Sequence, residues 1–131
     1  FPQGQQLDSI ARRPLWKVGL TYDHGTGHGI GSVLNVHEAF VGVYSDYYEK
    51  EPELQVGMFL SDEPGYYEEG KFGVRIENDI QVVATKTAYS KNNVTFLTFK
   101  TINLVPIQTS LLDMKLLTAE EVRNLSILSC T

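Results

Sequence analysis

The chain has 131 residues, of which 42% are hydrophobic, and this is enough for one domain with a core. Its formal net charge of −5 argues against a nucleic-acid-binding surface, which is normally basic. No apolar run approaches the roughly 20 residues that cross a bilayer, so we expect no membrane partner. The single cysteine, Cys130, excludes an internal disulfide and favours a reducing compartment, the cytoplasm.

Apolar residues at helical spacing from Leu7 to Leu15 predict an N-terminal helix. Pro14 should kink this helix or begin a second short turn that ends by Gly19, because proline removes a backbone donor. The glycine-rich block at 24–31 is expected to be irregular or strand-like, since several glycines weaken a helix.

The rest of the chain is typical of short strands joined by turns. Turn signals at Pro64-Gly65 and at 68–70 favour antiparallel pairing. Extended segments are expected at 33–36, 58–61, 72–84 (long, and bulged where its alternation shifts) and 95–105, with a polar loop at 40–57. Thr118 and Glu121 have the spacing of a capping box, which predicts a C-terminal helix with one apolar face: Val122, Leu125 and Leu128.

All three histidines of the chain, His24, His28 and His37, fall within fourteen residues. The first two lie in a run that contains four glycines, Tyr22 to Gly31. Imidazole is the commonest metal ligand and titrates near neutral pH. Glycine lets the backbone approach a ligand closely. This block therefore indicates a metal or catalytic site.

Two glutamates and an arginine extend this candidate site. Glu63 precedes a turn at an expected strand end, where a side chain is held rigidly beside a cleft. On a strand, Arg75 and Glu77 point to one face, while Val74 and Ile76 should point to the other face, into the core. A buried charged pair is costly unless Glu77 binds a cation and Arg75 donates hydrogen bonds nearby.

The motifs HGTGHGIG, NVHE, SDEPGYY and FGVRIEN, followed by LVPIQT at 104–109, resemble a known family. They are similar to the C-terminal half of the catalytic domain of Xaa-Pro aminopeptidase (aminopeptidase P) of the soluble eukaryotic type. The resemblance covers nearly the whole chain, with the motifs in the family's order. It implies an α+β fold, the C-terminal half of a pita-bread (creatinase/aminopeptidase) fold, with a curved antiparallel sheet and flanking helices. Residues 1–131 would form a single partial catalytic domain.

The resemblance also implies roles for individual side chains. Three of them would be metal ligands, with the last bridging two ions: His28, Glu63 and Glu77. Four would be catalytic, with the glutamate as general base: His24, His37, Glu63 and Arg75. Three would contact the substrate: His24, His28 and His37. The cofactors would be two divalent ions, most suitably manganese, with zinc as an alternative.

The implied activity is hydrolysis of peptides with proline at the second position, which releases the residue before proline. The family's metal site also uses two aspartates, and no aspartate of this chain falls at a matching position. We therefore expect both to lie upstream of residue 1, the chain to be an inactive fragment on its own, and its metal occupancy to be partial or absent. Half of such a domain would expose a strand edge that favours a homodimer or self-association. A non-catalytic pita-bread module for peptide or protein binding is the alternative.

Overall fold

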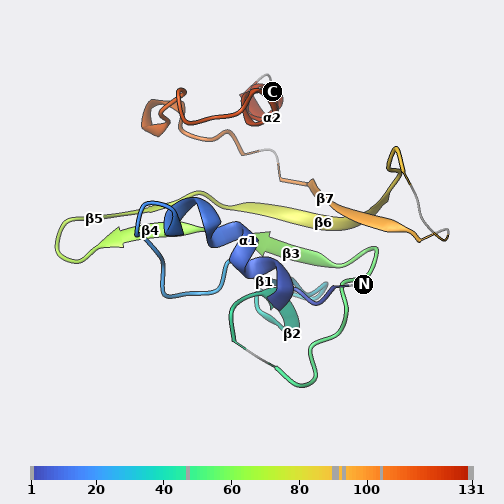
Figure 1. Cartoon of the computed structure of the whole chain (residues 1–131). Coiled ribbons are helices and arrows are strands. Elements are labelled where there is room, and N and C mark those ends of the chain that lie inside the picture. Colours follow the sequence, from blue (N-terminus) through green and yellow to red (C-terminus); the bar gives the residue numbers. More distant parts are fainter. Residues whose placement is uncertain (1, 47, 90–91, 93, 104, 130–131) are drawn as a thin grey trace.

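The computed structural model describes residues 2–46, 48–89, 92, 94–103 and 105–129, without the side chains of 124 and 126–129. The element order, shown in Figure 1, is α1 (Gln5–Trp16), β1 (Gly27–Gly29), β2 (Glu38–Val43), β3 (Phe59–Asp62), β4 (Gly65–Glu68), β5 (Phe72–Arg75), β6 (Asn78–Thr85), β7 (Phe96–Thr101), the 3-10 turn η1 (Thr109–Leu111) and α2 (Ala119–Ser129). Five strands form one sheet in the order β2-β1-β3-β6-β7, and β4 pairs with β5. All the pairs are antiparallel, as the turn signals predict.

Strands β3, β4, β5 and β6 form one long ribbon with a single interruption. Asp62 lies opposite Asn78 at the end of the β3–β6 ladder, and Gly65 lies opposite Arg75 at the start of the β4–β5 ladder. Both ladders therefore share one register, which is broken only at 63–64 and 76–77. Pro64 has no backbone N–H to give to a ladder, and this accounts for the break. The strand expected to be continuous over 72–84 is thus two strands.

Helix α1 lies across the sheet and packs on β2, as Figure 1 shows. It continues through Pro14 to Trp16 and is followed by a turn at 17–19, so the turn expected to end by Gly19 comes after the helix rather than beginning at Pro14. Proline close to the C-terminal end leaves most of the helical hydrogen bonds intact. The Glu51 carboxylate accepts the N–H of Gln5 at 3.3 Å, which satisfies a free donor at the helix start.

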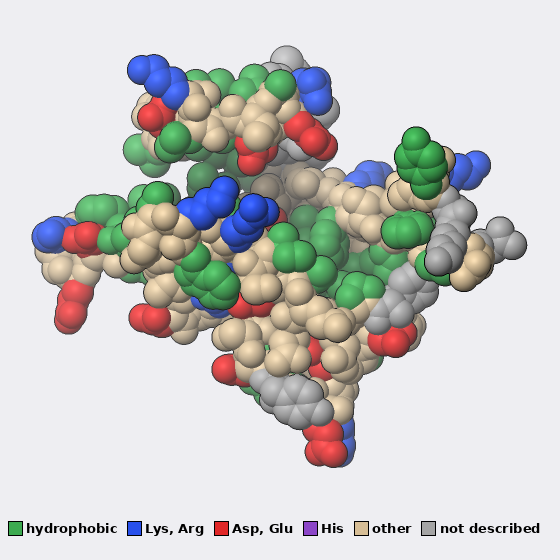
Figure 2. Space-filling view, in the orientation of Figure 1, with side chains coloured by type: hydrophobic (Ala, Val, Ile, Leu, Met, Phe, Trp, Pro, Cys, Tyr) green, Lys and Arg blue, Asp and Glu red, His purple; other side chains and the backbone are tan. Residues whose placement is uncertain are grey.

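The buried apolar core is small and lies on the sheet. It consists of Val43, Leu54, Leu60, Ile80 and Val82. Figure 2 shows apolar side chains left exposed over the part of the sheet formed by β6 and β7. Along β7, Phe96 is 45% and Phe99 40% exposed.

Three further expectations from the sequence are wrong. The segment 33–36 is not a strand, because Leu34 has a positive φ of 51°. The expected loop at 40–57 overlaps β2, whose last residue, Val43, belongs to the core. Val74 and Ile76 do not enter the core: they are 44% and 38% exposed and line an apolar hollow beside α1.

The C-terminal helix begins as its capping box predicts. The Thr118 N–H donates to the Glu121 carboxylate at 2.6 Å, and the Glu121 N–H donates back to the Thr118 hydroxyl at 3.3 Å. The predicted apolar contact of Leu128 and the thiol of Cys130 lie outside the described residues. No described helix has the length and apolar character of a bilayer-spanning segment.

Candidate metal centre

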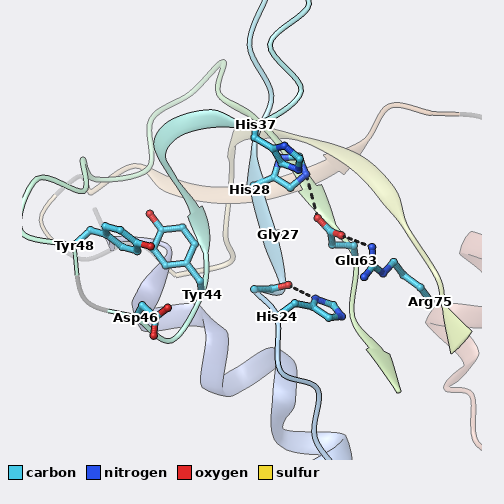
Figure 3. A pocket seen from close by; sticks show the side chains of 10 residues that line it. His24, Gly27, His28, His37, Tyr44, Asp46, Tyr48, Glu63 and Arg75 are labelled. Atoms are coloured by element: carbon cyan, nitrogen blue, oxygen red, sulfur yellow. Dashed lines mark hydrogen bonds and ion pairs between the residues drawn. The ribbon is translucent and has the colours of Figure 1, made fainter. Parts of the chain in front are cut away.

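The structure brings the three histidines into one cleft of about 390 Å³. Strand β1 carries His28, the segments on either side of it carry His24 and His37, and Glu63 and Arg75 enter from the ribbon (Figure 3). The opposite wall is aromatic and acidic, with Tyr44, Asp46 and Tyr48. The sequence spacing of the histidines therefore corresponds to a common location in space.

Glu63 is the centre of the polar contacts in this cleft. Its Oε1 lies 3.2 Å from Nε2 of His28, and its Oε2 lies 3.2 Å from Nη1 of Arg75 (Figure 3). Oε1 also accepts a hydrogen bond of 2.8 Å from the Ser61 hydroxyl. Only 9% of Glu63 is exposed, so this carboxylate has exchanged water for three fixed partners.

The contact between His28 and Glu63 has a specific chemical meaning. Nδ1 of His28 lies 2.9 Å from the Gly29 carbonyl oxygen, and because a carbonyl only accepts, Nδ1 carries the proton. In the neutral ring, Nε2 therefore presents a lone pair to the Glu63 carboxylate. Two acceptors at 3.2 Å need a shared proton or a cation between them. A backbone carbonyl that fixes the other ring nitrogen is the usual arrangement for a metal-binding histidine.

Close approach of β1 and β3 holds His28 and Glu63 together. The Ser61 hydroxyl, which donates to Glu63, accepts the His28 backbone N–H at 2.9 Å. A Cβ on Gly27 would lie only 1.9 Å from the Ser61 carbonyl oxygen, so only glycine fits where these two strands approach. This explains one of the glycines between the first two histidines.

His24 belongs to a second hydrogen-bonded chain at the cleft mouth. Its Nδ1 donates to the Gly25 carbonyl at 2.7 Å, so the neutral ring accepts at Nε2 from the Tyr67 hydroxyl at 2.8 Å. The same Tyr67 oxygen accepts from Nε of Arg75 at 2.9 Å. Arg75 thus reaches both Glu63 and Tyr67. The hydrogen bond to Tyr67 raises the Arg75 pKa above its ordinary value; burial opposes this, and the charges of Glu63 and Glu77 add to it.

Glu77 occupies the interruption of the ribbon rather than a strand. By the shared register of the two ladders, its position is opposite Glu63. It lines an adjoining hollow with Arg75 and 105–108 rather than the histidine cleft. Among the residues that the structure describes, no group of three His, Cys, Asp or Glu side chains is arranged to hold one metal ion. The role of Glu77 as a ligand therefore stays a prediction.

His37 lies against His28, with the ring centroids 4.3 Å apart and the planes inclined by 61°. The catalytic and substrate-binding roles expected for His24, His37 and Arg75 likewise stay predictions. Two positioning residues were missed from the sequence: Ser61 and Tyr67. The signal for Tyr67 was its position in the β4–β5 hairpin. Side chains alternate along a strand, and this places Tyr67 on the same face of the hairpin as Arg75.

Comparison with known proteins defines the class of the fold and site. The chain aligns over 98% of its length with the crystal structure of X-prolyl aminopeptidase from Caenorhabditis elegans, described as a cytosolic enzyme with a di-nuclear active site. The TM-score is 0.86 and the identity 42%, and the match covers 20% of that chain. A dipeptidase from Pyrococcus horikoshii matches 60% of this chain and 21% of its own, at 41% identity and a TM-score of 0.52. The predicted α+β fold, half of a pita-bread fold, is confirmed.

The sequence comparisons give the family. Residues 2–84 match metallopeptidase family M24, and residues 95–126 match the C-terminal region of peptidase M24. Probable Xaa-Pro aminopeptidases P from Fusarium vanettenii and Phaeosphaeria nodorum are 49% and 50% identical over 124 residues, 92% of this chain. The chain therefore belongs to metallopeptidase family M24, and the resemblance to Xaa-Pro aminopeptidases is confirmed. It spans about a fifth of the length of these relatives.

Proposed function

We propose that this chain supplies part of the dinuclear metal centre of an Xaa-Pro aminopeptidase. The observation that carries the proposal is the facing pair of acceptors, Nε2 of His28 and Oε1 of Glu63, 3.2 Å apart. The relatives named as Xaa-Pro aminopeptidases and the neighbour described as having a di-nuclear site support it. The substrates would be peptides with proline at the second position. The protein would be located in the cytosol, as the neighbouring enzyme is described to be.

Three side chains would hold the ions: His28, Glu63 and Glu77. One imidazole and two carboxylates form a donor set that suits manganese and also accepts zinc. Such ions, when bound, supply Lewis acidity and a water of lowered pKa. The remaining ligands would be two aspartates outside residues 1–131, and in their absence we expect weak metal binding and no turnover.

The cleft gives the other side chains their proposed roles. Glu63 would accept the proton of the attacking water as general base, since its carboxylate is already oriented by Ser61. His24 and His37 would donate hydrogen bonds to the substrate around the scissile bond. His28 would contact the substrate as well as the ion. Arg75 would hold Glu63 and Tyr67 in place.

Calorimetric titration of this chain with Mn²⁺ tests the metal site. We expect Glu63→Gln and Glu77→Gln to lower the affinity by about tenfold or more, because neutral amides are poor ligands for a hard cation. Glu69→Gln changes an exposed glutamate in the same ribbon and should leave the affinity unchanged. Equal affinity of Glu63→Gln and the unchanged chain would remove Glu63 from the ligand set.

Hydrolysis of an X-Pro peptide tests the incomplete centre. The chain alone should be inactive, and a longer polypeptide that adds the two aspartates should hydrolyse the peptide. Two tightly bound ions with rapid turnover by residues 1–131 alone would contradict this. Peptide binding without any metal affinity would instead favour a non-catalytic peptide-binding module.

A further inference from the structure

A charged pair is buried on the inner face of α1, behind the cleft. Asp8 is 2% exposed and Arg12 is 5% exposed, and Nε of Arg12 donates to Oδ2 of Asp8 at 2.6 Å. Removing two charges from water has a large desolvation cost, which a single ion pair seldom offsets. The remaining polar atoms of the pair show what else it binds.

Those atoms all contact one short segment, 22–26. The Arg12 guanidinium donates through Nη1 to the Tyr22 carbonyl at 2.5 Å and through Nη2 to the His24 carbonyl at 2.7 Å. Oδ1 of Asp8 accepts the Thr26 hydroxyl at 2.7 Å, so that hydroxyl in turn accepts from the Tyr22 hydroxyl at 2.6 Å. The guanidinium also lies 4.0 Å over the Tyr22 ring. Residues 22, 24 and 26 are therefore each tied to the helix.

This segment connects the pair to two groups of the cleft. His24 directs its ring to Tyr67, and the Thr26 carbonyl accepts the Glu63 N–H at 2.7 Å. Neither Asp8 nor Arg12 lines the histidine cleft. The pair acts on the cleft through the backbone, and the fixed planar geometry of guanidinium suits this, because it directs several donors at once.

We propose that Asp8 and Arg12 are positioning residues that set the direction of the His24 ring in the cleft. The two carbonyls held by Arg12 lie on either side of Asp23 and the His24 Cα, and the second of them belongs to the peptide plane that follows the His24 Cα. The value of this for catalysis rests on the proposed function, in which His24 faces the substrate. The structural statement stands on the contacts alone.

The NMR signals of the three histidine rings in the metal-free chain test this proposal. In Arg12→Lys, which keeps the charge but loses the fork, we expect the His24 Cε1–Hε1 signal to shift and the His24–Tyr67 nuclear Overhauser effect to be lost. The His28 signal should stay in place, since the Ser61 hydroxyl holds its backbone from the other side. Arg13→Lys, an exposed neighbour on the same helix, is the matched control.

A second variant, Thr26→Val, keeps the ion pair and the side-chain size but removes the hydrogen bond from the Thr26 hydroxyl to Asp8. It should shift the His24 Cε1–Hε1 signal in the same direction as Arg12→Lys, by a smaller amount. An unchanged His24 signal in folded Arg12→Lys overturns the proposal. Equal shifts of all three histidines, or unfolding of both variants, also overturn it, because they make the pair a general stability element. Chelator is present throughout, so failure of metal binding, which tests the proposed function, leaves these results unaffected.

Discussion

Replacement of Gly27 by alanine tests whether the close approach of the paired strands β1 and β3 assembles the site. The added Cβ would lie 1.9 Å from the Ser61 carbonyl oxygen and 2.9 Å from its carbon, and both are backbone atoms that no rotamer change can move. An ordinary contact is about 3.4 Å or longer, so the strands must separate by about 1.5 Å. The substitution is therefore expected to act on the backbone of both strands.

Separation on that scale breaks two hydrogen bonds beside the site. The His28 N–H to the Ser61 hydroxyl is 2.9 Å, and the Glu63 N–H to the Thr26 carbonyl is 2.7 Å. Each inner donor that loses its partner costs about 1–3 kcal/mol, so the two together predict a loss of about 2–6 kcal/mol in the free energy of unfolding. The His28–Glu63 contact of 3.2 Å should be lost with them.

Gly19→Ala is the matched control. Gly19 has a φ of +78° and no atom within 4 Å of an added Cβ, so it carries backbone strain of roughly 1–2 kcal/mol without a clash. Urea unfolding gives both free energies, and Mn²⁺ titration gives the effect on the site. If Gly27→Ala is no more destabilising than Gly19→Ala and binds Mn²⁺ as well as the unchanged chain, the close approach of β1 and β3 does not hold the site.

Three further outcomes are expected. Leu60 is 0% exposed, and Leu60→Ala should lower the free energy of unfolding by about 2–5 kcal/mol. Leu116 is 82% exposed, and Leu116→Ala should change the free energy of unfolding by less than about 0.5 kcal/mol. Similar losses for the two variants would mean that the core is elsewhere. Thr118→Ala should reduce the helicity of α2 by circular dichroism and cost about 1 kcal/mol, because the capping box is lost; unchanged helicity would contradict the cap. Burial, and then the Glu63 charge, raise the pKa of Asp62 above its ordinary 3.8, so the folded chain takes up that proton before the unfolded chain does. The free energy of unfolding should therefore rise as the pH falls from the raised pKa toward 3.8. In urea unfolding at stepped pH, Asp62→Asn should be more stable than the unchanged chain at neutral pH and should lack this rise. A lower stability of Asp62→Asn at pH 7 would refute the cost of burying the Asp62 charge.

Local signals in the sequence predicted the elements that depend on local interactions. The Thr118 capping box marked the start of α2, and the turn at Pro64-Gly65 marked the antiparallel ribbon. The expectations failed where distant residues decide the conformation. The backbone of Leu34 takes a left-handed conformation, which a leucine in the sequence does not indicate. Val43 lies in a strand because it pairs with Gly27 of β1.

The candidate site was predictable in its chemistry but not in its supports. The clustering of the histidines indicated a site from residue types alone, whereas the approach of Glu63 to His28 was implied by the family resemblance. Ser61 gave no sequence signal, since a serine in a strand is ordinary until the partner strand is known. The buried pair of Asp8 and Arg12 reads in the sequence as a solvated i,i+4 pair, and only the packing of α1 on the sheet turns it inward.

The broken ribbon divides the backbone amides near the site into two classes of hydrogen-exchange protection. Strands β3 and β6 lie inside the five-stranded sheet, between β1 and β7. In contrast, β4 and β5 pair only with each other, and β5 is exposed along its length. Opening of the β4–β5 end should therefore require less free energy than global unfolding. Tyr67 and Arg75 belong to this readily opened end, while His28 belongs to the protected sheet. Arg75, which lines the cleft, thus lies on a part of the chain that opens more readily than the strand that carries His28.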